Sequence, residues 1–194
     1  MFVAGRAPRV SRPRLYLVRH GESTWNAAGL LQGRTAHVPL SALGRAQAEE
    51  LARRLGSVPV AEVYTSDQLR CLQTARPIAA AHGLWPRPDP ALREQGHGSW
   101  EGRPTRGRAA TLAGAGPDWA PPGGETARAV HRRALEFLRR LAAGRPDGAV
   151  VVVSHGETIR ALLAVLSGHG AARMPRELPG NGQVMIIELE RAVV

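Results

Sequence analysis

The sequence predicts an α/β fold, a three-layer α/β/α sandwich whose central sheet is mostly parallel. The first observation is that short apolar segments alternate with longer segments of helical periodicity along most of the chain. The second is that the most apolar segments, LYLV and AVVVV, show no polar alternation, which is typical of strands covered on both faces. The third is the length of 194 residues, which fits one domain with one core.

The chain is expected to enter this domain after a short leader. Residues 1–13 are basic, contain proline and lack periodicity, so we expect a flexible leader followed by a single domain over residues 14–194. LYLV is the first expected strand. Ser41 is a suitable N-cap for the first helix, which Gly56 should end. Leu43, Gln47, Leu51 and Leu55 follow the cap at four-residue spacing, which is typical of a helix.

The remaining elements continue the alternation. Residues 60–65 predict a strand, and residues 67–82 predict a helix that Pro77 interrupts. Residues 103–124 are rich in Gly, Ala and Pro and predict a loop with at most a short helix, which suits a cover over a site. The last expected elements are a helix over residues 126–143 capped by Thr126, a strand over 149–153, a helix over 157–166 and a strand over 183–189.

The composition excludes several chemistries. All 26 basic residues are arginine, so Walker-type phosphate loops, Schiff-base chemistry and lysine-dependent kinase sites are ruled out. The aspartates stand singly, at Asp67, Asp89, Asp118 and Asp147, which disfavours chemistry on clustered metal ions. The lone cysteine, Cys71, can close no intrachain disulfide, and packing is the expected role of this small side chain.

The formal net charge of +10 raises the question of a nucleic-acid partner. The arginines are dispersed in short runs such as SRPR and HRR, so nucleic-acid binding is disfavoured, and anionic small molecules explain the sign of the charge equally well. No apolar run is long enough to cross a bilayer, and the first residues lack the apolar region of a secretory signal. We therefore expect a cytoplasmic protein without a membrane partner.

Two histidines follow predicted strands independently of each other. Arg19 and His20 end the first strand, and Ser154 and His155 end the AVVVV strand. Because ligands gather beyond the carboxyl ends of parallel strands, we expect both imidazoles at one site. A neutral imidazole can attack an anionic centre, and arginines such as Arg19 and Arg70 can stabilise the charge of a transferring phosphoryl group.

The same residues carry a family resemblance. In order along the chain, LVRHGESTWN (17–26), LQG (31–33), PLSALGRAQA (39–48), YTSDQLRCLQTA (64–75), LREQGHGSWEG (92–102), PGGET (122–126) and VSHGETIR (153–160) resemble the histidine phosphatase superfamily. The resemblance extends over about residues 15 to 189. It implies a phosphoglycerate mutase-like fold and hydrolysis of a small phosphorylated metabolite through a phosphohistidine, with no metal and no cofactor.

The resemblance also implies roles for individual residues. His20 matches the nucleophile, and Arg19, Arg70 and His155 match the phosphate pocket. Asn26 matches a further phosphate contact, and Glu94 matches the proton donor to the leaving oxygen. Glu94 should then be protonated when substrate binds, and His155 should be cationic or a hydrogen-bond donor, whereas His20 needs a free lone pair.

Three departures from the usual family pattern bear on the substrate. His37 replaces the usual Asp, His97 replaces an aromatic or aliphatic residue, and Glu157 replaces a small residue. A Glu157 charge near the leaving group would disfavour a carboxylate and favour a sugar, nucleoside or polyol phosphate, although an exposed glutamate at a helix start explains it equally well. Gln32 and Gly33, of the LQG block, are candidates for substrate contact, and Gln32 could equally hold its loop.

Other residues have structural interpretations. Packing is the expected role of Trp100 and Glu101, and His82, His131 and His169 are expected at the surface or at helix ends.

The reaction and the assembly stay open at this point. A phosphatase is favoured over a mutase because the 103–124 segment is short and open compared with the longer arginine-rich lid of the mutases. A weakly active, arginine-rich binding protein is the remaining alternative, and a homodimer stays possible.

Overall fold

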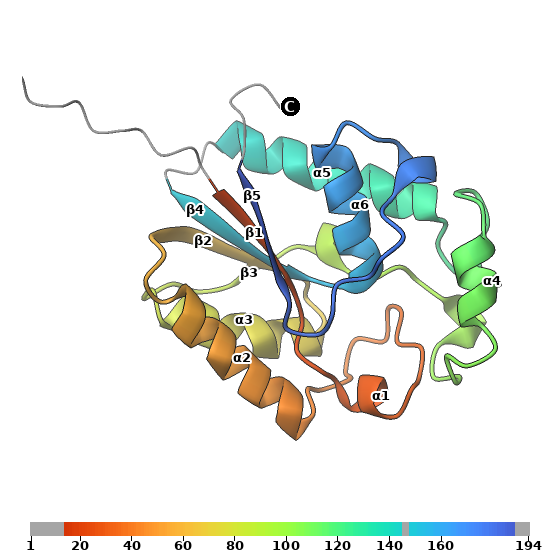
Figure 1. Cartoon of the computed structure of the whole chain (residues 1–194), viewed down its shortest axis with the longest axis horizontal. Helices are drawn as coiled ribbons and strands as arrows, with labels where there is room; N and C mark the ends of the chain where they lie inside the picture. The colour runs from red at the N-terminus through yellow and green to blue at the C-terminus, as the bar shows by residue number, and fades with distance from the viewer. Residues whose placement is uncertain (1–13, 145–147, 189–194) are drawn as a thin grey trace, which may run out of the picture.

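The computed structural model describes residues 14–144 and 148–188 and contains a five-stranded sheet in the order β3-β2-β4-β1-β5 (Figure 1). Neighbouring strands run parallel except β5, which lies antiparallel to β1, so the mostly parallel sheet is confirmed. The strands are β1 (Arg14–Arg19), β2 (Val60–Thr65), β3 (Arg87–Pro88), β4 (Ala149–Ser154) and β5 (Val184–Glu188).

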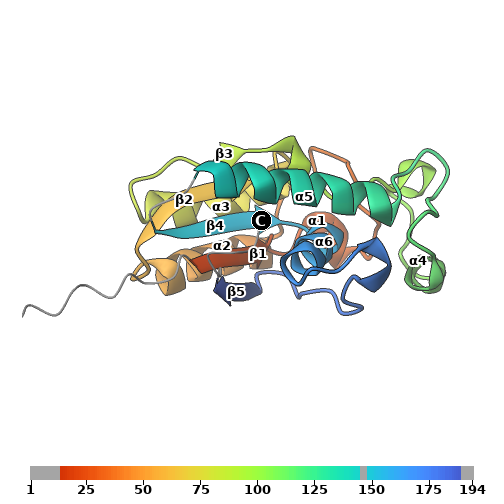
Figure 2. The same cartoon turned by 90° about the horizontal axis from the view of Figure 1, so that it is seen from above.

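Helices cover both faces of the sheet, which confirms the three-layer sandwich (Figures 1 and 2). One face packs against α2 (Ala42–Leu55) and α3 (Leu69–Ala80), and the other against α5 (Ala127–Gly144) and α6 (Gly156–Leu166). The shorter α1 (Thr24–Ala27) and α4 (Ala109–Gly114) lie at the end of the molecule toward which β1 and β4 run.

The side chains of β1 show why its sequence is apolar without interruption. Leu15 and Leu17 pack into the core beneath α5 and α6, whereas Tyr16 and Val18 pack into the core beneath α2 and α3. Successive side chains of a strand point to opposite faces, so a strand covered on both sides needs an apolar residue at every position. The two cores fix the end of β1, and with it the position of the residues that follow.

The first long helix begins and ends as predicted, between the caps Ser41 and Gly56. The Oγ atom of Ser41 accepts a hydrogen bond from the Gly44 backbone N–H at 3.0 Å, which confirms the cap. Leu43, the first residue of the four-residue row, is 55% exposed and lies outside the core. A β-carbon on Gly44 would lie 1.9 Å from the backbone oxygen of Glu22, so this glycine lets α2 press against the chain that follows His20. The buried stripe is Gly44, Ala48, Leu51, Ala52 and Leu55.

The later elements follow the prediction closely. The predicted bounds of β2 are confirmed at both ends, and α3 starts two residues later than predicted and contains Pro77 within its last turns. The Thr126 hydroxyl oxygen accepts a hydrogen bond from the Ala129 N–H and caps α5 as predicted. Within residues 103–124 the structure has one short helix, α4. The predicted leader over residues 1–13 and the predicted strand end at Leu189 lie outside the described residues.

Candidate active site

A cavity of about 670 Å³ opens beyond the carboxyl ends of β1 and β4. This is the edge of the sheet at which both predicted histidines were expected to meet. His155 is fully buried beside His20 and does not itself line the cavity. The other predicted site residues all line it: Arg19, His20, Asn26, Gln32, Gly33, Arg70, Glu94 and Glu157.

His20 is held in one orientation by the backbone around it. The backbone N–H of His20 donates to the Ser154 carbonyl at 3.0 Å, which ties this residue to β4. The ring Nδ1 lies 2.7 Å from the Gly21 carbonyl oxygen. A carbonyl oxygen only accepts, so Nδ1 carries the hydrogen and Nε2 keeps the lone pair. Burial, and then the charges of Arg70 and Arg19, lower the pKa of His20 well below its ordinary value. His20 is therefore a neutral imidazole with a free Nε2.

His155 lies behind His20, with ring centroids 5.0 Å apart in an edge-to-face arrangement. Burial, then Arg70, lower its pKa well below the ordinary value, so the expectation of a cationic His155 does not hold for the free protein, and a neutral donor is what remains. The Cys71 sulfur lies 3.3 Å from His155 Nε2, and burial raises the pKa of this thiol. Cys71 thus packs as a neutral thiol against the second imidazole.

The two buried neutral histidines make folding stability depend on pH. The unfolded chain takes up protons on both imidazoles below pH about 6.5, whereas the folded protein does not, so the free energy of unfolding falls as the pH falls. Each histidine contributes roughly 1.4 kcal/mol per pH unit below that value. Glu157, whose pKa burial and Glu94 raise, acts in the opposite direction.

Urea unfolding between pH 7.5 and 5.5 measures this dependence. The slope of the free energy of unfolding against pH reports how many protons the chain takes up on unfolding. We expect this number to fall by about one in His20→Ala, because one of the two imidazoles is gone. An unchanged slope in that variant would show that His20 is protonated in the folded protein.

Two guanidinium groups flank the histidines. Arg70 is fully buried and donates to the Thr35 carbonyl at 2.9 Å and to the Gly33 carbonyl at 3.0 Å. Arg19 donates to the Pro179 carbonyl at 2.5 Å. The Nε atoms of Arg19 and Arg70 are buried without a hydrogen-bond partner. Such unsatisfied donors in a cavity wall are what a bound anion would satisfy.

Asn26, Gln32 and Gly33 contribute a further part of the cavity wall. The Asn26 side-chain oxygen accepts a hydrogen bond from the Ser23 backbone N–H at 3.1 Å and closes the capping box of α1. The Ser23 hydroxyl contacts the Gln32 side-chain oxygen at 2.7 Å, so Gln32 both lines the cavity and holds its loop. Gly33 has a φ of +48°, and a β-carbon there would lie 2.2 Å from a Glu101 oxygen. Its carbonyl accepts hydrogen bonds from both Arg70 and Gln68.

Glu94 points its carboxylate at the first turn of α6. Its Oε1 accepts hydrogen bonds from the Gln95 N–H at 2.9 Å and the Thr158 N–H at 3.3 Å, and its Oε2 accepts only from the Glu157 N–H at 3.4 Å. A β-carbon on Gly156 would lie 3.8 Å from both Glu94 Oε2 and the Arg19 guanidinium carbon, so this glycine keeps the space between them open. Oε2 is the less engaged oxygen and the one available to exchange a proton with a ligand.

The three departures from the family pattern lie in different places. His97 lines the cavity and is 6% exposed, whereas His37 is exposed and does not line the cavity. Glu157 lines the cavity and receives two hydrogen bonds from Arg160, at 3.0 and 2.8 Å. Glu157 lies in the first turn of α6, as the helix-start interpretation expected, but it is half-buried and not exposed.

Sequence reasoning missed the segment between α6 and β5. The Asn181 amide donates to the His20 carbonyl at 3.1 Å and to the Asn26 side-chain oxygen at 3.2 Å, and Arg176 and Leu178 line the cavity. No motif marks these residues, and the one available signal was the run LPGNG, which indicates a turn.

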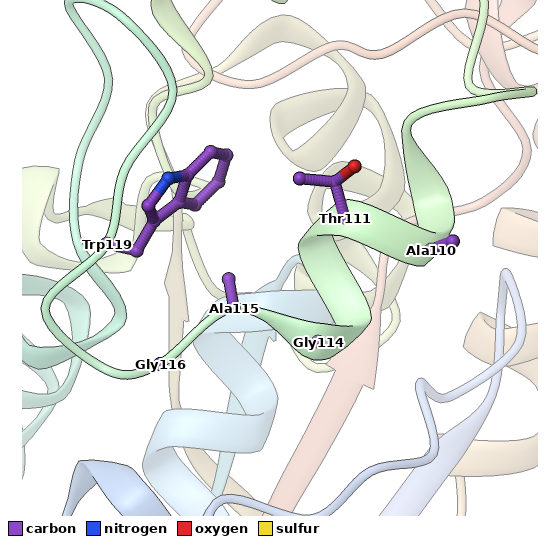
Figure 3. Close-up of a pocket in the computed structure, with 6 residues that line it drawn as sticks. All are labelled: Ala110, Thr111, Gly114, Ala115, Gly116 and Trp119. Carbon is purple, nitrogen blue, oxygen red and sulfur yellow. The ribbon is translucent and has the colours of Figure 1, made fainter.

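The 103–124 segment borders the cavity with Thr105, Leu112 and Gly114. Gly114 also lines a second, more open hollow of about 430 Å³, in which the Trp119 indole faces Thr111 of α4 (Figure 3). The Trp119 and Trp100 ring centroids are 5.6 Å apart, which fits the packing role expected of Trp100. The Glu101 carboxylate accepts hydrogen bonds from the Arg34 N–H, the Thr35 hydroxyl and the His97 N–H. It thereby joins the loop of Arg34 and Thr35 to the backbone at His97.

Two further searches concern only the described part of the chain. Over residues 14–144 and 148–188, no group of three or more His, Cys, Asp or Glu side chains is placed to hold a metal ion. In the same ranges, no helix combines the length and apolar character needed to cross a membrane.

Comparison with known proteins places this site in a family context. The model of the histidine phosphatase superfamily (branch 1) matches residues 15–193. The fructose-2,6-bisphosphatase TIGAR of Xenopus laevis is 38% identical over 139 residues, which cover 68% of this chain and 50% of TIGAR. The probable phosphoglycerate mutase GpmB of Yersinia enterocolitica is 36% identical over 169 residues, which cover 80% of this chain and 75% of GpmB. The chain thus spans about half the length of the TIGAR relative.

Solved structures give the same grouping. A mycobacterial glucosyl-3-phosphoglycerate phosphatase superposes with a TM-score of 0.81 and 32% identity, covering 90% of this chain and 89% of the other. A structure described as a putative alpha-ribazole-5'-P phosphatase of Escherichia coli superposes with a TM-score of 0.82 and 30% identity, covering 93% and 92% of the two chains.

Proposed function

The chain belongs to the histidine phosphatase superfamily (branch 1), and on this premise we propose that it hydrolyses a small phosphomonoester through a phosphohistidine on His20, without a metal ion. The observation that carries the proposal is the hydrogen bond of His20 Nδ1 to the Gly21 carbonyl at 2.7 Å. It leaves the Nε2 lone pair free in a cavity that Arg19, Arg70 and Glu94 also line.

In the first step, His20 Nε2 attacks the phosphorus atom and the bond from phosphorus to the leaving oxygen breaks. Arg19 and Arg70 bind the non-bridging oxygens and stabilise the charge that spreads over them, which is the role that a metal ion has in other phosphatases. Glu94 Oε2 gives its proton to the leaving oxygen, so the product departs as an alcohol. His155 does not line the cavity, and its part in this step is to pack behind the His20 ring and hold it in place.

In the second step, a water molecule attacks the phosphorus and the bond to His20 Nε2 breaks. Glu94, now a carboxylate, accepts the proton of that water, and inorganic phosphate leaves. The free enzyme is restored with a protonated Glu94 and a neutral His20. One carboxyl group therefore serves both half-reactions.

Hydrolysis is favoured over mutase activity by the cover of the cavity. The 103–124 segment contributes only the one-and-a-half-turn α4 and the residues Thr105, Leu112 and Gly114 to the wall, and such a cover gives water access to the phosphohistidine. A mutase has to retain the phosphohistidine and exclude water. The relatives named as fructose-2,6-bisphosphatase and glucosyl-3-phosphoglycerate phosphatase support the same choice.

Phosphate release tests this proposal. With EDTA present, we expect the protein to release inorganic phosphate from several members of a panel of sugar, nucleoside, polyol and glycerate phosphates. If EDTA stops the release and added magnesium restores it, the metal-free mechanism is wrong. Conversion of 3-phosphoglycerate to its 2-isomer without release of phosphate would instead establish a mutase.

A further inference from the structure

The outer wall of the cavity contains an arginine that the reaction does not use. Arg176 belongs to the segment between α6 and β5, is exposed, and lines the same cavity as His20. Among the described residues it has no hydrogen-bond or ion-pair partner. A cation without a partner at the mouth of a catalytic cavity is available to bind an anionic part of a ligand.

Contacts on both sides of Arg176 anchor the segment that carries it. The Pro175 carbonyl accepts a hydrogen bond from Arg160 Nε, and the Pro179 carbonyl accepts one from Arg19 at 2.5 Å. Leu178 packs over Gly156, where a β-carbon would lie 2.9 Å from a Leu178 methyl group. The segment is thereby tied to α6 on one side of Arg176 and to the catalytic Arg19 on the other. Arg176 therefore stands on an anchored wall of the cavity.

The charges that line the cavity are not balanced by one phosphoryl group. Four arginines and two glutamates line it. Glu157 is paired with Arg160 through two hydrogen bonds of 3.0 and 2.8 Å. The mechanism proposed above requires Glu94 in its neutral form as the proton donor. A phosphoryl dianion then balances the charges of Arg19 and Arg70. The positive charge of Arg176 remains unbalanced.

This pairing also changes what Glu157 can do to a substrate. The sequence suggested that a lone Glu157 charge would repel a carboxylate on the leaving group. Because Arg160 neutralises that charge, the repulsion is removed, and the net charge of Glu157, Arg160 and Arg176 together is positive.

We propose that Arg176, next to the Glu157–Arg160 pair, forms a subsite for a second anionic group, so the preferred substrates are phosphomonoesters whose leaving group carries a carboxylate or a second phosphate. The cavity of about 670 Å³ has the size of pockets that bind whole metabolites. The proposal rests on the phosphatase activity proposed above, and it assigns a substrate class to that site.

The test compares leaving groups on the wild type, Arg176→Gln and Arg173→Gln. Arg173 is the matched control, because it is exposed, lies three residues away and does not line the cavity. The substrates are 3-phosphoglycerate, fructose 1,6-bisphosphate, and the neutral-leaving-group esters glucose 6-phosphate and p-nitrophenyl phosphate. Steady-state kcat/KM is measured for each at low and high potassium chloride concentration.

We expect the wild type to prefer at least one of the two substrates with a second anion. Arg176→Gln should lower the kcat/KM of that substrate about tenfold more than that of the neutral esters, mostly through KM, since a charged hydrogen bond is lost. Salt should weaken the preference in the wild type, and Arg173→Gln should keep it. The comparison of 3-phosphoglycerate with fructose 1,6-bisphosphate shows whether the subsite binds a carboxylate or a phosphate.

A preference for neutral leaving groups in the wild type, or an equal loss for all substrates in Arg176→Gln, would overturn the subsite. If the wild type hydrolyses none of the esters, including p-nitrophenyl phosphate, the proposed phosphatase activity is what fails. Calorimetric binding of 3-phosphoglycerate and glycerol 3-phosphate to the same three proteins then decides the subsite without catalysis: tighter binding of the former that Arg176→Gln removes supports it, and equal binding refutes it.

Discussion

His20→Ala is expected to abolish phosphate release from every substrate, with a loss in kcat of roughly 10⁴-fold or more, the size typical of removing a nucleophile. The reason is that His20 Nε2 is left free at the carboxyl end of β1, since Nδ1 is bonded to the Gly21 carbonyl at 2.7 Å. Without Nε2 no phosphoryl-enzyme can form, and the arginines alone bind substrate without turning it over.

The matched control is His37→Ala. His37 is exposed and lies outside the cavity, so its loss should leave kcat and substrate preference unchanged. Thermal unfolding of both variants separates loss of chemistry from loss of structure. Activity of folded His20→Ala within a factor of about ten of the wild type would contradict the role of His20 as nucleophile.

Glu94→Gln is expected to show a loss that depends on the leaving group. For alkyl phosphates, whose leaving oxygen needs a proton, kcat should fall about 10² to 10⁴-fold, the range of general acid catalysis. For p-nitrophenyl phosphate the leaving oxygen departs as a stable anion, so the first step should be nearly unaffected. The amide retains the hydrogen-bonding shape beside α6 but has no proton to give.

The second half-reaction gives Glu94→Gln a further signature. Because the same carboxylate takes the proton of the attacking water, p-nitrophenyl phosphate should produce a burst of nitrophenol followed by slow turnover, as the phosphoryl-enzyme accumulates. Glu177→Gln, on an exposed residue that does not line the cavity, is the control. Equal losses for alkyl and aryl substrates would show that Glu94 does not act as the acid.

The elements of this fold could be predicted where local signals determine them. The prediction of a strand from Val60 to Thr65 is confirmed as β2, and the predicted cap at Ser41 is confirmed as a local hydrogen bond. The meeting of His20 and His155 was predictable from a rule about sheets, since both follow parallel strands that pair in register. The bounds of β2 and the cap at Ser41 depend on residues that are close in the sequence, and the meeting of the histidines depends on the pairing of their strands.

The features that were not predicted arise from contacts between distant parts of the chain. Leu43 is apolar and correctly spaced, but Gly44 needs close contact with the Glu22 backbone, and this turns Leu43 to solvent. The sequence around Cys71 contains no signal that its thiol contacts His155. The sequence around Asn181 likewise contains no signal that its amide donates to the His20 carbonyl.

One missed contact was nonetheless readable from the sequence. Glu157 and Arg160 are three residues apart on a helix, the spacing at which side chains pair. Recognising this pair would have removed the argument that Glu157 repels a carboxylate.

The most direct test of the account is to look for the phosphohistidine itself. Wild-type protein mixed with excess substrate, quenched within milliseconds in base and digested, should give one peptide heavier by a phosphoryl group, with the added mass on His20 and labile in acid. Glu94→Gln with p-nitrophenyl phosphate should raise its yield. Rapid turnover with no phosphorylated peptide at any quench time, or with the added mass on a residue other than His20, would contradict the mechanism.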